Sequence, residues 1–300
     1  MYILADFADK EQKVNVKSYQ RLRNGRLETV QAFDSTRRKR DEDQPNNTGR
    51  NLLIGAAITG GVLAAGLLAF KGATGAVRSD VVNKSDMGID EVLKTTKSLT
   101  VNTKPLEYKD ADILIAVNGI NGTTKELDDY NDVAKGLDLA LNNGNKKVNV
   151  IPFTIAYDLT GMDISKKPDL AGGFKTLKNL LYGEKTNTKT AELMKTVQAY
   201  QAQYPNKKIT VVGFSMGGYV ATNAAYKLND PRIQTISIAA PNISKRQPPN
   251  YTAVRAKNDD VIPGIAFSGK EIVLDDADSH IGTMSSKKGF DLLYKKVYGG

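Results

Sequence analysis

The amino-acid sequence predicts an α/β protein with a mostly parallel central sheet. From about residue 90 to the C-terminus, strand-like and helix-like patterns alternate, which is typical of strands joined by helical crossovers. The strand-like runs are short and apolar, as expected of strands that are covered by helices on both faces. Upstream of them, a long uncharged stretch follows a basic segment. These two features predict that the domain is anchored to a membrane.

Each predicted element has its own pattern. Apolar runs rich in β-branched residues predict strands over residues 113–117, 148–155, 209–212, 233–238, 252–256 and 272–274. Apolar residues at helical spacing predict helices over residues 125–142, 191–204, 217–227 and 289–298. The stretch 157–188 is long for a connection and could form a lid over a site at the edge of the sheet.

The composition limits the chemistry that the chain can perform. With 300 residues, 40% of them hydrophobic and 25% charged, the chain can form one large domain with additional segments. It contains no cysteine, which excludes disulfides, thiolate nucleophiles and cysteine metal sites. No metal-ligation pattern is evident in the sequence, so we expect neither a metal nor a cofactor. The net charge of +9 would suit nucleic acid or an anionic membrane surface, and since no nucleic-acid motif is present, we expect the membrane.

Residues 52–70 carry no charged side chain. At 1.5 Å of rise per helical residue they would cross a hydrocarbon core about 30 Å thick, so we predict one transmembrane helix over residues 51–71. About fifty polar residues precede this stretch, which argues against a cleaved signal peptide. A buried, glycine-rich core helix is the alternative interpretation.

Charge on either side of the uncharged stretch predicts its orientation. The run "TRRKR" (residues 36–40) and Arg50 precede it, whereas Lys71 and Arg78 follow it sparsely, so the N-terminus is expected in the cytoplasm and the C-terminal part across a single-pass membrane. A bacterial inner membrane is the expected location, because Asn121 in "NGT" would be an awkward glycan acceptor in a eukaryotic host. Small residues at four-residue spacing could also pair two such helices into a homodimer.

Two further segments lie beside the predicted transmembrane helix. Residues 1–50 form a basic N-terminal region, in which two strand-like runs meet at Asn24 and Gly25, a pair that favours a two-residue hairpin turn. A loosely folded basic tail is the alternative. Residues 72–104 have the composition of a spacer, and residues 105–300 contain the predicted α/β domain.

The run "KITVVGFSMGGYV" (residues 208–220) places Ser215 between a strand and a helix, in the pattern Gly-x-Ser-x-Gly. A sharp turn of this kind presents the serine on a strained backbone, and the glycines two positions away avoid side-chain clashes. The N-terminus of the following helix would point N–H groups toward the serine oxygen, which makes the N–H of Met216 a candidate oxyanion donor. A glycine-rich helix start is the alternative interpretation of the same residues.

A serine nucleophile requires a base, and the chain contains one histidine, His280, between the last predicted strand and the final helix. Asp259 and Asp260 follow the strand 252–256 and offer a carboxylate to orient the imidazole. Serine, aspartate and histidine then occur in the chain order of a nucleophile-elbow triad. Three more aspartates lie close to the histidine in sequence: Asp275, Asp276 and Asp278. They could bind a cation or raise the basicity of the imidazole, although a solvated acidic turn is the simpler interpretation.

These motifs resemble the α/β-hydrolase superfamily over about residues 105–300: "GFSMGG" for the elbow, "NDDVIP" for the acid turn and "DSH" for the histidine turn. The resemblance implies an α/β-hydrolase fold with serine esterase or lipase-like activity, in which Ser215, Asp259 and His280 form the triad. In the family the acid commonly stands two residues before an apolar residue. Val261 fits that position, so Asp259 is the expected acid and Asp260 the alternative.

The resemblance also implies a second oxyanion donor in the loop after the strand 113–117. In the family this loop often begins with a His-Gly pair, whereas here Asn118 and Gly119 occupy the two positions. The N–H of Ile120 is the expected donor and that of Gly119 is the alternative. An ordinary polar turn would have a similar composition.

The expected function is that of a membrane-anchored serine hydrolase that cleaves carboxylic ester or lipid bonds through an acyl-enzyme. Thioesterase, acyltransferase and peptidase chemistry would use the same triad, and the fold does not choose among them. A further alternative is a non-catalytic, membrane-anchored interaction protein on a hydrolase scaffold. The serine, the single histidine and a suitably placed aspartate argue against that alternative, because a scaffold needs none of the three.

Overall fold

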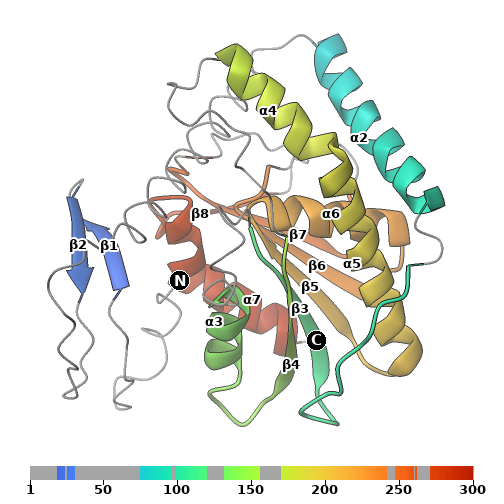
Figure 1. Ribbon diagram of the computed structural model, residues 1–300. Coiled ribbons are helices and arrows are strands. Elements are labelled where there is room, and N and C mark those ends of the chain that lie inside the picture. Colours follow the sequence, from blue (N-terminus) through green and yellow to red (C-terminus); the bar gives the residue numbers. More distant parts are fainter. Residues whose placement is uncertain are drawn as a thin grey trace, which may run out of the picture.

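A single parallel sheet forms the centre of the protein in this computed structural model, which describes residues 19–23, 26–30, 75–95, 99–119, 132–155, 170–241, 247–259, 261 and 271–299. In this part of the chain the six strands have the order β4-β3-β5-β6-β7-β8, and all neighbours pair in parallel (Figure 1). They are β3 (Asp112–Val117), β4 (Val148–Phe153), β5 (Ile209–Phe214), β6 (Ile233–Ile238), β7 (Tyr251–Ala256) and β8 (Glu271–Leu274). The predicted mostly parallel sheet is therefore confirmed.

Helices cover both faces of this sheet (Figure 1). One face carries α2 (Gly75–Thr95), α4 (Leu170–Tyr182), α5 (Glu184–Gln203) and α6 (Met216–Leu228). The other face carries α3 (Asp132–Leu141), α7 (Lys287–Tyr298) and the short 3₁₀ helix η3 (Ile281–Ser285). This arrangement explains why the central strands β3 and β5 are mostly apolar, since both of their faces are buried.

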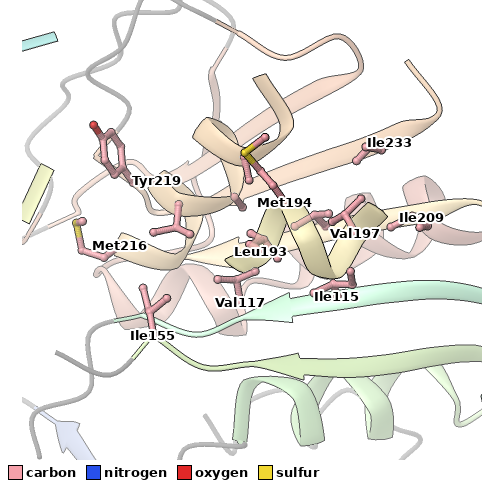
Figure 2. Packing of buried hydrophobic residues seen from close by; sticks show 14 of the residues in the cluster. Ile115, Val117, Ile155, Leu193, Met194, Val197, Ile209, Met216, Tyr219 and Ile233 are labelled. Carbon is pink, nitrogen blue, oxygen red and sulfur yellow. The ribbon is translucent and has the colours of Figure 1, made fainter. Parts of the chain in front are cut away.

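In strand β3, alternate side chains pack against the helices on the two opposite faces of the sheet. Ile115 and Val117 point into the cluster that α4, α5 and α6 cover, whereas Leu114 packs with Leu137 of α3 on the opposite face. Figure 2 shows the first cluster, in which side chains of α5 such as Leu193 pack over β3. Each fully buried aliphatic side chain of this kind contributes about 1.5–3 kcal/mol relative to leaving it exposed.

The first helix of this domain is a correction to the sequence prediction. The pattern over residues 72–104 predicts a spacer, but the structure contains α2, and Val81 and Ile89 are buried in the core. A side chain on Gly88 would overlap the Asn187 amide of α5, so this glycine allows the two helices to approach. The mostly polar sequence conceals the helix, because few of its positions face the core.

The second half of the stretch 157–188, expected as a long connection, contains a helix. Residues 170–182 form α4, and its side chains Leu177 and Leu181 are buried in the core. The next helix, α5, begins at Glu184 instead of residue 191. Its first turns bury Thr186 and Thr190, whose hydroxyls bond backbone carbonyls, so no apolar periodicity marks them. Residues 156–169 lie outside the described part of the chain.

The N-terminal region contributes one described element, the antiparallel pair β1 (Tyr19–Arg23) and β2 (Arg26–Val30). Arg23 pairs with Arg26, which leaves the two-residue connection that the sequence predicts. The apolar stretch 52–70 and residues 125–131 of the helix predicted over residues 125–142 lie outside the described residues. Among the helices that the structure describes, none is both long and apolar enough to span a bilayer, so the transmembrane helix stays a prediction.

Candidate active site

The strand order creates a crevice at the carboxyl ends of the central strands β3 and β5, where a site can form. The chain passes from β3 to β4 on one side, and β5 then pairs with β3 on the other side. Such a reversal separates the loops that follow the two central strands, and α/β sheets bind ligands in this crevice. Gly119 follows β3 and Ser215 follows β5, so both lie at this edge of the sheet.

Ser215 occupies a backbone conformation that a helix start does not require. Its φ is 55° and its ψ is −126°, in a region that costs a non-glycine residue about 1–3 kcal/mol. An ordinary N-cap serine is extended and accepts a helix N–H with its side chain. Within the described residues, the Ser215 side chain makes no such capping bond. The geometry therefore favours a nucleophile elbow over a glycine-rich helix start.

Backbone contacts hold this turn in place. The Ser215 N–H donates to the carbonyl of Ile238 at 2.9 Å, and the Ser215 carbonyl accepts the N–H of Gly218 at 2.9 Å. A Cβ on Gly213 would lie 2.6 Å from the Cα of Gly218, and one on Gly217 would overlap the carbonyl oxygen of Asn118. The two glycines of the motif are therefore needed where helix α6 turns back onto β5 and approaches the end of β3.

The oxyanion side of the site is described in part. A Cβ on Gly119 would lie 3.2 Å from the Cβ of Ser215, so Gly119 lies directly against the serine. Met216 is the first residue of α6, and the first N–H groups of a helix lack intrahelical acceptors. Ile120, the other predicted donor, lies outside the described residues. The serine thus has the first N–H groups of α6 on one side and Gly119 on the other.

The structure brings together the predicted histidine and the predicted acid. The two carboxylate oxygens of Asp259 lie 3.0 and 3.1 Å from Nδ1 of His280. Both residues are almost fully buried, with exposed fractions of 8% and 7%. The N–H of Val261 donates to Oδ1 of Asp259 at 3.0 Å, which fixes the carboxylate from a second direction. Asp260, the alternative acid, lies outside the described residues.

Phe214 connects this pair to the serine. Its ring centroid lies 5.1 Å from that of His280, with the planes tilted by 41°, and it is the residue directly before Ser215. Nδ1 faces Asp259, so Nε2 lies on the opposite side of the imidazole ring. Strand β5 and the turn before η3 therefore present serine and histidine to the same region.

The acidic turn beside His280 has structural partners. Asp276 accepts hydrogen bonds from the Ser286 hydroxyl and from the N–H of Lys288 at the start of α7. The Lys288 ammonium donates to Asp275 and holds the pKa of that carboxyl below its ordinary value. Among the described residues, no group of acidic or histidine side chains fits a metal ion. These two aspartates thus serve the start of α7.

Two residues around His280 were not singled out by their sequence pattern. Phe214 is the second residue of the elbow motif, and that position accepts any residue type. The motif therefore does not predict its contact with the imidazole. Thr283 follows the histidine by three positions within η3, and its hydroxyl accepts the N–H of Ala256 at the end of β7. Only the tertiary structure reveals that contact.

A parallel sheet with an elbow serine at its switch point and a buried aspartate–histidine pair beside it defines the class of α/β hydrolases. The chain belongs to the α/β hydrolase fold family, whose sequence model matches residues 114–283. No curated protein matches the chain.

Several solved structures are similar to this chain at low sequence identity. A lidless α/β serine hydrolase from Xanthomonas campestris is 18% identical, with 65% of this chain and 84% of that chain covered and a TM-score of 0.40. An esterase is 14% identical, with 65% and 96% covered and a TM-score of 0.46. Trichoderma reesei cutinase in complex with a phosphonate inhibitor is 14% identical, with 77% and 95% covered and a TM-score of 0.37.

Proposed function

We propose that this protein is a serine hydrolase that cleaves acyl bonds of carboxylic esters or lipids, with Ser215 as nucleophile, His280 as base and Asp259 as the acid that orients it. One observation carries the proposal. The only histidine of the chain is buried against Asp259 at 3.0 Å and against Phe214, the residue next to a strained serine. A structural role for these residues would require neither the strain nor the buried carboxylate partner.

The proposed reaction assigns one task to each group. Nε2 of His280 takes the proton of the Ser215 hydroxyl while the serine oxygen attacks the acyl carbon, and the Nδ1–H stays directed to Asp259. The resulting oxyanion accepts hydrogen bonds from the N–H of Met216 and from the loop after β3, where Ile120 or Gly119 would donate. His280 returns the proton to the departing alcohol. Water then attacks the acyl-enzyme in the same way and releases the acid.

The main competing proposals differ in what they predict for turnover. A thioesterase, acyltransferase or peptidase would use the same residues on another acyl donor or acceptor. A non-catalytic interaction protein would turn over none of these acyl substrates. The β1–β2 hairpin, which supports no step of the reaction, is the feature that favours an additional binding role.

The decisive assay compares wild type with Ser215→Ala on a series of acyl donors. Nitrophenyl esters of increasing chain length, a phospholipid, a thioester and a peptide amide are offered in detergent, with and without an alcohol acceptor. We expect ester hydrolysis by wild type and a loss of several orders of magnitude in the variant. Turnover of the thioester or peptide alone would reassign the substrate class, and equal rates for both proteins would refute the proposal.

We also propose that residues 52–70 anchor the hydrolase domain to a bacterial inner membrane, with the N-terminus in the cytoplasm. The uncharged length and the basic residues before it support this proposal. Membranes washed with alkaline carbonate should retain the full chain, and protease added to spheroplasts should digest the C-terminal domain first. Recovery in the wash, or protection of that domain, would contradict it. Crosslinking in the membrane would test whether the apolar segment also pairs two copies.

A further inference from the structure

Strand β7 extends beyond its neighbour β6, and this leaves a backbone group to be satisfied. Pairing between the two strands ends where Ile238 faces Val254. The Val254 carbonyl still accepts the N–H of Ala239 at 2.7 Å, but Ala256 lies two residues further along on the same side. Ala256 is completely buried, so its N–H requires an acceptor that the strand β6 no longer offers.

The hydroxyl of Thr283 provides this acceptor. Its Oγ1 lies 3.2 Å from the N–H of Ala256, and the hydroxyl donates in turn to the carbonyl of Ser279 at 3.2 Å. The Thr283 N–H reaches the same carbonyl at 3.1 Å. Thr283 is 3% exposed. One hydroxyl thus bridges the residue directly before His280 to the last residue of β7, three positions before Asp259.

We infer that Thr283 is a positioning residue for the proposed triad: its hydroxyl ties the turn that carries His280 to the strand end that carries Asp259, and so sets the imidazole against the carboxylate. The inference rests on the proposed function for its effect on turnover. Backbone pairing between β7 and β8 reaches Ala256 and Leu274, with one further bond from the Lys257 N–H to the Leu274 carbonyl. This pairing stops before the turn that carries His280, and the Thr283 hydroxyl adds a side-chain link from that turn to the end of β7.

Two pairs of variants isolate the hydroxyl. Thr283→Val replaces it by a methyl group of the same shape, and Thr283→Ser keeps it while removing the methyl, with Thr283→Ala as the hydroxyl-free partner of the serine. Thr196→Val is the matched control, because that buried hydroxyl bonds the Glu192 carbonyl within α5. Circular dichroism and thermal unfolding establish that each variant is folded.

We expect Thr283→Val and Thr283→Ala to lower kcat by about 10- to 100-fold, with KM changed by less than about threefold, because a small misplacement of a catalytic group affects the chemical step. Thr283→Ser and the Thr196 control should stay within about threefold of wild type. Val and Ala variants with wild-type kcat, or a serine variant as impaired as the alanine variant, would overturn the inference. Unfolding of both hydroxyl-free variants would assign the hydroxyl to the stability of the whole fold and would overturn it equally.

A second readout does not depend on turnover. Because the chain has one histidine, the low-field proton signal of an Nδ1–H donated to a carboxylate belongs to a single residue. We expect this signal to be present in wild type and Thr283→Ser, and to move or to be lost to exchange in Thr283→Val and Thr283→Ala. The same signal in all four proteins would overturn the inference. If wild type hydrolyses no acyl donor, the proposed function fails, and the comparison of these signals still decides the role of Thr283.

Discussion

At the scale of single residues, the site depends on the buried carboxylate of Asp259. Asp259 faces Nδ1 of His280 and also accepts the N–H of Val261. A buried carboxylate is stable only where partners replace its hydration. Both partners here come from a short stretch of chain and one turn, so the direction of the carboxylate is fixed before any substrate arrives.

This geometry predicts that two adjacent aspartates differ in their effect on turnover. Asp259→Asn should reduce kcat by about 10⁴-fold, because the amide favours the wrong histidine tautomer. Asp260→Asn should keep most of the activity. Steady-state kinetics of both variants check this expectation. The reverse result would move the acid by one place, and two active variants would mean that the acid lies elsewhere.

The residues of the candidate site differ in how much their sequence context reveals. Ser215 is marked by glycines that a sharp turn needs, and His280 and Asp259 are recognisable because they follow the last strands in chain order. The register that selects Asp259 for contact with His280 comes from the Val261 spacing in the family. Thr283 and Phe214 have no such marker, since their contacts join elements that are distant in sequence.

At the scale of elements, helix α6 must approach the end of β3 closely for the elbow to form. The backbone of Gly217 lies against the carbonyls of Val117 and Asn118, whereas Gly144, in the turn after α3, has nothing within 4 Å of an added Cβ. Packing between α6 and β3 requires glycine at residue 217. At residue 144 the structure leaves room for a side chain.

We therefore expect Gly217→Ala to lower the free energy of unfolding by about 1–3 kcal/mol through overpacking, and to reduce turnover because the serine turn shifts. Gly144→Ala should change the free energy of unfolding by less than about 0.5 kcal/mol. Urea denaturation of both variants measures the difference. Equal stability of the two would show that α6 and β3 are further apart than described.

Helix α2 belongs to the hydrolase domain, and its two faces make this testable. Ile89 is 1% exposed and Met87 is 67% exposed on the same helix. We expect Ile89→Ala to lower the free energy of unfolding by about 2–4 kcal/mol, and Met87→Ala to change it by less than about 0.5 kcal/mol. A small effect of both substitutions, measured by thermal or urea unfolding, would support the spacer that the sequence pattern predicts.

The elements were predictable where the core is apolar and obscure where it is polar. All six strands of the central sheet follow from runs rich in apolar residues, because the covering helices bury most of their positions. Helix α2 and the start of α5 do not, since their inward positions include Gly88, Thr186 and Thr190. Polar side chains that bond the backbone can be buried at these positions just as apolar side chains can. A search for hydrophobic periodicity does not detect them.

At the scale of the whole molecule, one charged cluster links the covering helices to the sheet. Asp230, in the turn before β6, accepts hydrogen bonds from Arg232 and from Gln201 of α5. The hydrogen bonds from Arg232 hold the pKa of Asp230 well below its ordinary value of 3.8. The folded state thus binds this proton more weakly than the unfolded state, and the resulting stability is complete above pH 4 or so and is lost as the pH falls toward the folded-state pKa.

Asp230→Asn should consequently lower the free energy of unfolding by about 1 kcal/mol at pH 7. The difference from wild type should shrink steadily once the pH falls below the ordinary carboxyl range, because wild type then loses the same interaction. Urea denaturation at pH 7, 5 and 3 gives the comparison. A difference that stays constant down to pH 3 would show that the carboxylate charge is not what the turn uses.

The central claim is that the two layers of helices and the sheet present Ser215 to His280 as an activated nucleophile. Labelling with a fluorophosphonate tests it most directly, since the reagent forms a covalent phosphonate only with a serine that a base activates. We expect mass spectrometry to find the adduct on Ser215 of wild type, no adduct on Ser215→Ala, and at least a 100-fold slower reaction for His280→Ala. Equal labelling of wild type and Ser215→Ala, or no reaction with wild type, would contradict the account.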